Sequence, residues 1–365
     1  MKVECTRDKF KECVMQVGKI SARNLSLPIL ESILIEAKDR VLILKATNLD
    51  IGMEVRMPAK VEKAGITTLP ADILSAFLSG LTGDQLIKIE LVNNNLSLST
   101  ARNSTIIKSL SADDFPIIPK IEEGSRFSIE AHKLVAGIKS VVYAAALSDM
   151  KPEISAVYIY TEGGDLIFAA TDSFRLAEKK VQGQLKDTMS IILPFKNANE
   201  IARIFEQNND VLDVRLSKNQ ISIFSPTIYF TSRVVGGVFP DYRQIIPKEK
   251  KTEVTVLKKD LIDSIKISNI FSDRLNQINI KVNPEDSLFE ISSRNQDKGE
   301  SATTVQAVIE GESVDVTVNA KYVLDCLPFV LSDSVHVIFN GRDRPIMMRG
   351  VGDSSFLCLV MPMNV

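Results

Sequence analysis

The sequence predicts an α+β protein built from three repeated domains, each with two helices packed on antiparallel sheets. The first observation is a strand-like stretch that starts at Leu42 and recurs at Leu166 and Leu288, so that successive copies begin 124 and 122 residues apart. The second is a shared order of apolar periods within each copy. A spacing of this size matches a whole domain and is far longer than a solenoid unit.

Each copy opens with alternating apolar residues, which then give way to apolar residues at helical spacing. Period two followed by a period near 3.6 predicts a strand that enters an amphipathic helix. The first apolar helix residue follows the first strand residue after seven positions in all three copies. The pairs are Val3 and Phe10, Phe127 and Leu134, and Val254 and Leu261.

Hairpins come next, with turns predicted at Lys38-Asp39 and at Gly163-Gly164, because Gly-Gly and Asp-containing pairs between apolar runs are hairpin signals. Meander hairpins also end each copy. The last strand is predicted at 355–361 and ends before Pro362.

A second helix is predicted in each copy from three anchors. Pro70 and Pro194 suit the first helical position, and Asn319 suits an N-cap. Apolar residues follow each anchor at the same four offsets. They are Leu74, Phe77, Leu78 and Leu81; Ala198, Ile201, Ala202 and Phe205; and Val323, Cys326, Leu327 and Val330.

The predicted domains are residues 1–121, 122–249 and 250–365. Their joints, near 120–124 and 248–252, are charged and follow a Phe-Pro turn, and the chain has enough apolar residues (45%) for cores in each domain.

Composition limits the function classes. No apolar run opens the chain or approaches the ~18 residues of a membrane span, so we expect a cytoplasmic protein. The four cysteines are scattered and are expected to be buried free thiols, and no spacing indicates a metal site or a cofactor. A net charge of −2 excludes a strongly basic nucleic-acid binder but permits loose contact through a local basic face.

No phosphate-binding loop, dinucleotide fingerprint or nucleophile elbow is present, so we expect no catalytic residues. Asp172 with Arg175 is better explained as an Asp that binds its own turn and an Arg that pairs with it. The helices carry a mild lysine bias without interleaved aromatics, which fits either solvated faces or sequence-independent phosphate contact.

Several stretches resemble one family. The residues at 170–176, 239–243, 319–324 and 360–363, with Leu27-Pro28-Ile29-Leu30 near the start, are similar to the bacterial sliding clamp, the β subunit of DNA polymerase III. The resemblance covers the whole chain, and the stretches occur in the family's order on repeats of the family's length.

This resemblance implies domains of the DNA-clamp type and a head-to-tail dimeric ring around double-stranded DNA, with helices inside and sheets outside. It implies a non-enzymatic processivity factor. The implied partners are the replicative polymerase, the clamp loader, repair polymerases and mismatch-repair proteins, which carry a short motif with a glutamine and a Leu-Phe-like end.

The resemblance also implies site residues. The partner-peptide pocket would consist of Ile154, Thr171, Phe174, Arg175, Leu176, Pro240, Ile245, Asn319, Tyr322, Ile346, Val360, Met361, Pro362 and Met363. DNA would contact Arg23, Asn24, Lys151 and Lys196, and the dimer would form between Thr105, Ile106 and Ile107 of one chain and Ile270 and Phe271 of the other.

The sequence departs from the family pattern at three positions. Asp72 stands where relatives can carry a basic residue, Phe174 replaces a histidine of some relatives, and Gln244 replaces an arginine. Two other readings remain open on the residues alone. One is an interaction scaffold that does not encircle DNA, and the other is an enzyme with a loop-built site at a domain joint.

Overall fold

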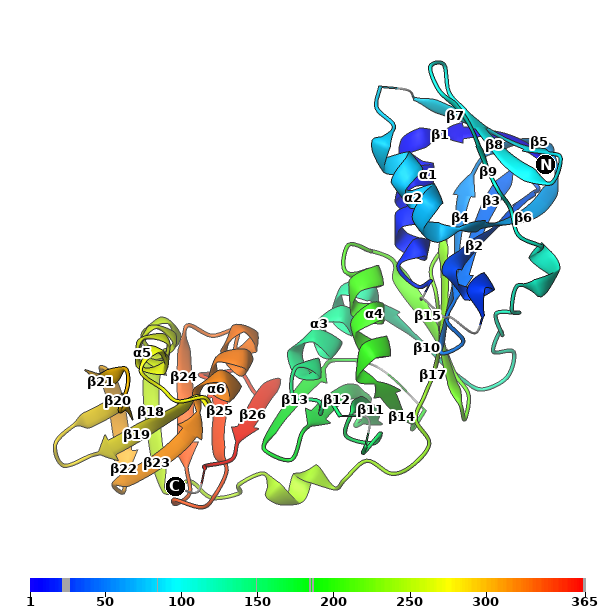
Figure 1. The fold of residues 1–365 in the computed structure, drawn as a ribbon. Helices are drawn as coiled ribbons and strands as arrows, with labels where there is room; N and C mark the ends of the chain where they lie inside the picture. Colours follow the sequence, from blue (N-terminus) through cyan, green and yellow to red (C-terminus); the bar gives the residue numbers. More distant parts are fainter. Residues whose placement is uncertain (22–26, 84, 149, 184, 186, 364–365) are drawn as a thin grey trace. The chain divides into compact units, whose positions relative to one another are not determined.

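The structure is a computed structural model that describes residues 1–365 except 22–26, 84, 149, 184, 186 and 364–365. The chain forms two compact units. The first contains Met1–His132 and Ile204–Val234, and the second contains Lys133–Arg203 and Val235–Val365. Figure 1 shows the elements of both units. No helix among the described residues is long and apolar enough to cross a membrane.

The first unit contains two antiparallel sheets. The five-stranded sheet has the order β5 (Lys60–Lys63), β1 (Lys2–Thr6), β7 (Leu86–Val92), β8 (Asn95–Ser99) and β9 (Ser104–Ile107). The eight-stranded sheet has the order β10 (Ser125–Glu130), β15 (Val211–Leu216), β16 (Gln220–Phe224), β17 (Ile228–Arg233), β4 (Ile51–Pro58), β3 (Val41–Thr47), β2 (Ser32–Lys38) and β6 (Gly65–Pro70).

The second unit also contains two antiparallel sheets. Its nine-stranded sheet has the order β14 (Ser190–Pro194), β11 (Ala156–Glu162), β12 (Asp165–Thr171), β13 (Arg175–Val181), β26 (Phe356–Val360), β25 (Ile346–Gly350), β24 (Ser334–Phe339), β18 (Thr252–Leu257) and β22 (Ala307–Gly311). Its four-stranded sheet has the order β21 (Gly299–Thr304), β20 (Leu288–Asn295), β19 (Gln277–Asn283) and β23 (Val314–Asn319).

Three pairs of α-helices are present in the described part of the chain, as the repeat predicts. They are α1 (Arg7–Gly18) and α2 (Ala71–Gly80), α3 (Ala131–Val142) and α4 (Phe195–Phe205), and α5 (Lys258–Ile270) and α6 (Ala320–Cys326). Helix α1 buries Phe10, Cys13, Val14 and Val17, which is one helical face, and it packs against α2 (Figure 1).

Several predicted boundaries were wrong by a residue or more. Pro70 precedes the helix instead of opening it, because it still pairs with Ser32 in the ladder and keeps an extended ψ of 125°. Pro194 is likewise the last residue of β14. The predicted turn at Lys38-Asp39 lies one residue further on, because Lys38 pairs with Val41 and the left-handed residues are Asp39 and Arg40.

The sheets continue across both predicted domain joints. In the first unit β17 pairs with β4, so that Thr231 faces Gly52. A Cβ on Gly52 would lie 2.6 Å from Ile118 Cγ2, which explains why glycine stands at this close approach. In the second unit β13 pairs with β26, so that Leu176 faces Leu359. The continued ladders remove sheet edges that would otherwise be exposed.

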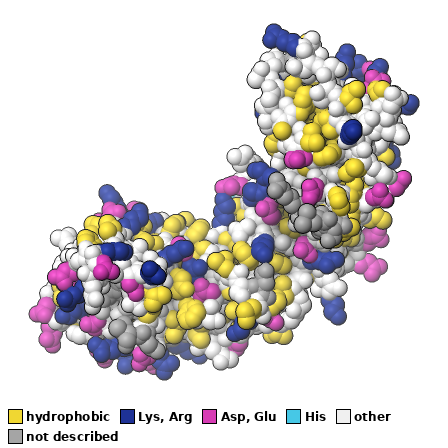
Figure 2. All heavy atoms as spheres, viewed as in Figure 1, with side chains coloured by type: hydrophobic (Ala, Val, Ile, Leu, Met, Phe, Trp, Pro, Cys, Tyr) yellow, Lys and Arg dark blue, Asp and Glu magenta, His cyan; other side chains and the backbone are white. Residues whose placement is uncertain are grey.

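Acidic and basic side chains are mixed on the face drawn in Figure 2, in keeping with the small net charge. The expectation of free thiols is confirmed, since Cys5, Cys13, Cys326 and Cys358 are all free and buried. Burial raises the pKa of Cys5 to about 12 and that of Cys13 to about 11.

Candidate functional site: the surface around Arg175

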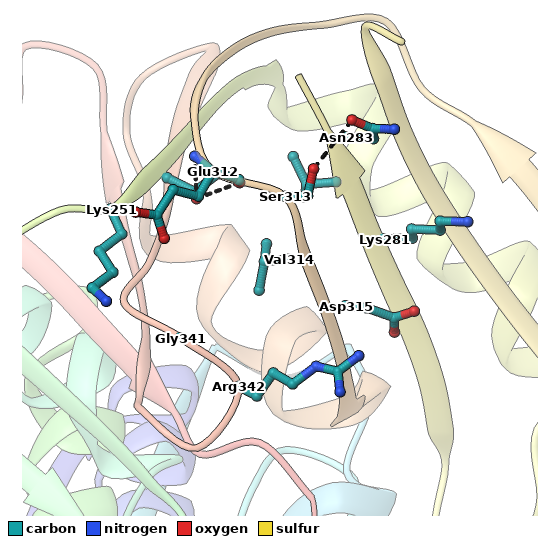
Figure 3. Close-up of a pocket in the computed structure, with 11 residues that line it drawn as sticks. Lys251, Lys281, Asn283, Glu312, Ser313, Val314, Asp315, Gly341 and Arg342 are labelled. Carbon is teal, nitrogen blue, oxygen red and sulfur yellow. Dashed lines mark hydrogen bonds between the residues drawn. The ribbon is translucent and has the colours of Figure 1, made fainter. Parts of the chain in front are cut away.

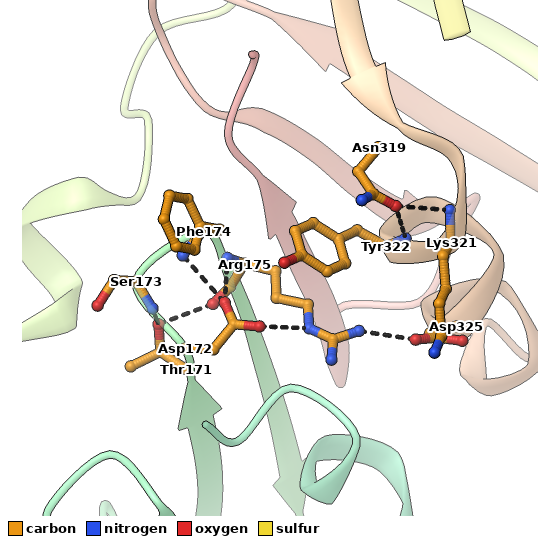
Figure 4. A network of polar contacts seen from close by, with 9 residues as sticks. All are labelled: Thr171, Asp172, Ser173, Phe174, Arg175, Asn319, Lys321, Tyr322 and Asp325. Carbon is orange, nitrogen blue, oxygen red and sulfur yellow. Dashed lines mark hydrogen bonds and ion pairs between the residues drawn. The ribbon is translucent and has the colours of Figure 1, made fainter. Parts of the chain in front are cut away.

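The turn between β12 and β13 is held by its own side chains (Figure 4). The backbone N–H groups of Phe174 and Arg175 both donate to Asp172 Oδ1, at 2.9 Å each. Thr171 Oγ1 donates to the Arg175 carbonyl at 2.7 Å and accepts from Ser173 N at 3.2 Å. Because the turn is closed in this way, the Phe174 side chain is left 61% exposed at its tip.

Arg175 is fixed from several sides (Figure 4). Its Nε donates to Asp172 Oδ2 at 2.9 Å, and its Nη1 donates to Asp325 Oδ2 at 2.7 Å. The guanidinium carbon lies 4.5 Å from the ring centre of Tyr322 and 5.6 Å from that of Tyr143. The predicted pairing of Asp172 with Arg175 is confirmed, and the site presents a pre-oriented guanidinium whose side chain is 11% exposed.

Helix α6 supplies Tyr322 and Asp325 from one face, because they are three residues apart. The predicted N-cap at Asn319 is confirmed: Asn319 Oδ1 accepts from Lys321 N at 2.9 Å and from Tyr322 N at 3.3 Å. Asn319 Nδ2 also donates to the Leu275 carbonyl at 3.0 Å. The cap thereby fixes the start of the helix that carries two of the partners of Arg175, Tyr322 and Asp325.

The segment after β26 runs beside this turn. The Met361 N–H donates to the Phe174 carbonyl and the Met363 N–H donates to the Thr317 carbonyl, both at 2.8 Å. The side chains of Met361, Pro362 and Met363 are partly exposed. The last strand, predicted at 355–361, was too long by one residue at each end, because β26 spans Phe356–Val360. Met361, Pro362 and Met363 follow the strand and lie at the surface.

A third segment, which includes η3 (Tyr242–Ile245), completes the site. Phe239 and Tyr242 are buried in a cluster with Leu176, whereas Pro240 and Ile245 stay exposed. The Tyr242 hydroxyl donates to the Glu178 carboxylate and lies 2.8 Å from the hydroxyl of Tyr160. Burial and the neighbouring carboxylate raise the pKa of Tyr242 far above its usual range, so the phenol stays protonated.

The predicted pocket residues lie in two layers of the second unit. An upper layer is exposed or partly exposed, and a lower layer is buried beneath it. The upper layer is Phe174, Arg175, Pro240, Ile245, Asn319, Tyr322, Met361, Pro362 and Met363, and the lower layer is Ile154, Thr171, Leu176, Ile346 and Val360. An adjoining cleft of about 580 Å³ shares Ile245 and Met361 with the upper layer.

Sequence reasoning missed Asp325 and Tyr143. The three-residue spacing between Tyr322 and Asp325 was the one signal in the sequence that could have suggested Asp325. Tyr143 gives no such signal, because it follows the end of α3 and reaches Arg175 only through the tertiary fold.

Among the predicted DNA-contacting residues, Lys151 lies beside Ile154, whose N–H donates to the Lys151 carbonyl at 3.1 Å. Lys151 is exposed, and Lys196 Nζ lies 5.9 Å from the ring centre of Phe195. Arg23 and Asn24 lie outside the described residues. Among the predicted dimer residues Ile106 is 66% and Ile270 is 64% exposed, Thr105 and Phe271 are half-buried, and Ile107 is buried.

A second cavity of about 330 Å³ lies at the ends of β19 and β23, with Lys281, Asp315 and Arg342 among its lining residues (Figure 3), and it shares Lys251 with the 580 Å³ cleft. It contains none of the predicted site residues. Across the described residues, no group of three or more His, Cys, Asp or Glu side chains is placed to hold a metal ion.

Three repeats of paired helices on antiparallel sheets that continue from one repeat into the next are the architecture of the DNA clamps. Models of the N-terminal, central and C-terminal domains of the DNA polymerase III beta subunit match residues 1–119, 128–241 and 243–364. The chain therefore belongs to the DNA polymerase III beta subunit family.

Individual relatives agree with this assignment. The chain is 28% identical to the beta sliding clamp of Bacillus subtilis over 100% of both chains, and 24% identical to that of Synechococcus elongatus, also over 100% of both. A DnaN sliding clamp from Pseudomonas aeruginosa bound to griselimycin superposes with a TM-score of 0.96 at 25% identity, covering 100% of both chains. The Bacillus subtilis clamp structure gives 0.96 at 27% identity, covering 100% of this chain and 99% of that one. The chain is thus a DNA sliding clamp of DNA polymerase III and a non-catalytic subunit.

Proposed function

We propose that the surface around Arg175 is where this clamp binds short peptide motifs of its partners: the replicative polymerase, the clamp loader, repair polymerases and mismatch-repair proteins. The observation that carries the proposal is the exposed apolar layer beside a pre-oriented arginine. Phe174, Pro240 and Ile245 are exposed above the buried layer of predicted pocket residues. Met361 and Met363 add flexible thioether side chains that can repack against different peptides.

Calorimetric titration with a short Gln-x-x-Leu-Phe peptide tests this proposal. We expect saturable binding in the micromolar range, which corresponds to roughly −8 kcal/mol. Met363→Ala should weaken it, because the Met363 side chain is partly exposed at the site. Met15→Ala, a partly exposed methionine of α1, is the matched control and should bind like the wild type. Absence of binding by the wild-type chain would refute the proposal.

We further propose that domains 1–121, 122–249 and 250–365 of two copies close head to tail into a ring. In the described part, β9 and β21 are each paired on one side only, at the ends of their sheets. Ile106 on β9 is exposed, and so is Ile270 at the end of α5, the helix that packs against β21. Pairing β9 of one copy with β21 of the other would extend both sheets and cover these apolar side chains.

Light scattering tests the ring. The wild-type chain should have the mass of a dimer, and Ile106→Asp should shift the mass toward that of one chain, because a charge would be placed in the apolar contact. Val92→Asp, an exposed apolar residue on β7, is the control and should leave the mass unchanged. A wild-type monomer at micromolar concentration would contradict the head-to-tail dimer.

We propose that duplex DNA passes through this ring in the cytoplasm, held by loose phosphate contacts from Arg23, Asn24, Lys151 and Lys196. The small net charge of −2 supports retention by topology over tight electrostatic binding. The protein should stay on circular DNA and be lost when the DNA is linearised. Equal loss from both forms would favour a protein-interaction scaffold that does not encircle DNA.

A further inference from the structure

The cleft that adjoins the Arg175 site extends beyond the residues predicted to hold the apolar motif. Its volume of about 580 Å³ falls within the range of roughly 300–1,000 Å³ typical of ligand sites. Two segments form its walls, one from the end of η3 to the start of β18 and one between β24 and β25, and Met361 also lines it. The lining residues are Gln244, Ile245, Ile246, Pro247, Lys248, Glu249, Lys251, Asn340, Asp343, Arg344, Pro345 and Met361.

Asn340 gives this cleft a polar group that the fold does not use. Both its Nδ2 and its Oδ1 are shielded from solvent, and neither has a hydrogen-bond partner in the structure. A shielded amide without hydrogen-bond partners costs about 1–3 kcal/mol in folding free energy, so buried amides are rarely left without a partner. One donor and one acceptor side by side match the C=O and N–H of an extended peptide backbone.

The charges of the cleft favour an acidic ligand. Lys248, Lys251 and Arg344 are exposed, and none of them forms an ion pair with another described residue. Nearby cations differ, since Arg243 pairs with Glu162 and Lys250 lies 3.3 Å from Glu253. The cleft also contains the carboxylates of Glu249 and Asp343, which leaves one more positive than negative side chain among its lining residues.

Ile245 belongs both to the predicted pocket and to this cleft, which indicates the end of the peptide that meets the cleft. The polar groups Asn319, Tyr322 and Arg175 suit a glutamine, and the apolar Pro240 and Ile245 suit the Leu-Phe end. Ile245 also lines the 580 Å³ cleft, so that the chain beyond Leu-Phe would enter it.

We propose that this cleft receives an acidic segment that directly follows the Leu-Phe end of a partner's motif. The Asn340 side chain, which has no hydrogen-bond partner to hold it, turns toward the cleft and binds a peptide group of that segment, and Arg344 and Lys248 bind its carboxylates. This proposal rests on the peptide-docking function proposed above and adds the chemical class of partner: motifs continued by Asp or Glu.

The test is a titration of three peptides into the whole protein: the Gln-x-x-Leu-Phe core, the core followed by Ser-Asp-Glu-Asp, and the core followed by Ser-Gln-Ser-Gln. We expect the acidic peptide to bind about three- to tenfold more tightly than the core, which corresponds to about 0.7–1.4 kcal/mol. The gain should shrink as salt is raised, because the cations are exposed. The uncharged Ser-Gln-Ser-Gln peptide should bind only slightly more tightly than the core peptide.

Two variants assign the gain to this cleft. Arg344→Ala and Lys248→Ala should each reduce the gain while leaving the affinity for the core peptide unchanged, since both side chains are exposed and outside the Arg175 site. Lys281→Ala is the matched control, an exposed cation of the neighbouring cavity in Figure 3, and should keep the full gain.

The outcomes separate the two proposals. Tight binding of the core with no gain from the acidic segment, or a gain that survives both variants, would overturn the acidic-segment proposal alone. Failure of the core peptide to bind the wild type would overturn the docking function and this proposal with it. If the acidic segment raised the affinity when it was placed before the glutamine, and not when it followed Leu-Phe, the assigned direction would be refuted.

Discussion

Replacing Asp325 by Asn tests whether Arg175 works as a pre-oriented group. The Arg175 Nη1–Asp325 Oδ2 bond is 2.7 Å long, and the two side chains are 11% and 29% exposed. A hydrogen bond between charged groups contributes about 1.5–3 kcal/mol. Because Asp325 is partly solvated and Arg175 keeps Asp172, we expect the free energy of unfolding to fall by about 1–2 kcal/mol.

Peptide affinity should fall as well. Asp325 is not among the upper-layer residues, so its effect on a peptide would act through Arg175. Once one side of the guanidinium is released, the side chain must be ordered again when the peptide binds, at a cost of about 0.5–1.5 kcal/mol. We therefore expect the Kd for the core peptide to rise about three- to tenfold.

Urea unfolding and calorimetry on the same samples measure the two effects. Asp297→Asn, an exposed aspartate on a turn of the third repeat, is the control and should change neither quantity. The reasoning fails if Asp325→Asn lowers stability but binds the peptide like the wild type, because Arg175 would then not need its second carboxylate.

Three further predictions follow from the structure. A chain truncated after Val360 should lose peptide binding but keep its far-ultraviolet circular dichroism, because it loses the partly exposed methionines and, among the described residues of the tail, only two backbone hydrogen bonds; loss of the folded spectrum would show that the tail is core. Cys5 and Cys13, with pKa values of about 12 and 11, should resist a thiol reagent at pH 8 until urea unfolds the chain, and rapid labelling of the native protein would contradict their burial. The hydrogen bond from Arg243 lowers the pKa of Glu162 below 4.5, so Glu162 should contribute stability above pH 4.5 that is lost as the pH falls through its folded pKa. The difference in unfolding midpoint between the wild type and Glu162→Gln should therefore vanish in acid. A difference that grows in acid would refute the assignment.

The sequence predicted those features that depend on local pattern. The period change from two to 3.6 located all three first helices, and Asn319 was a correct N-cap because capping depends on the next three residues. The Asp172 turn was predictable for the same reason. Element boundaries were weaker, as at Pro70, where the ladder with Ser32 extends the strand to the start of the helix.

Long-range contacts could not be read from pattern. Asp325 and Arg175 are 150 positions apart, so only the packing of α6 beside β13 brings them together. Asn340 resembled an ordinary loop residue, and its shielded amide becomes visible only in the folded chain. The pairing of β17 with β4 likewise depends on two predicted domains meeting at one ladder.

Strand β26 is the last of its sheet along the chain, yet it lies between β13 and β25. On a ribosome, the strands on either side of it are made earlier and can begin to pair before it emerges. Its insertion joins the two halves of the sheet and brings Met361 to the Phe174 carbonyl in the same event. An unfinished chain therefore lacks the pairing of β26 with β13 on which the proposed peptide site depends, so a nascent clamp would not yet bind a partner's motif there.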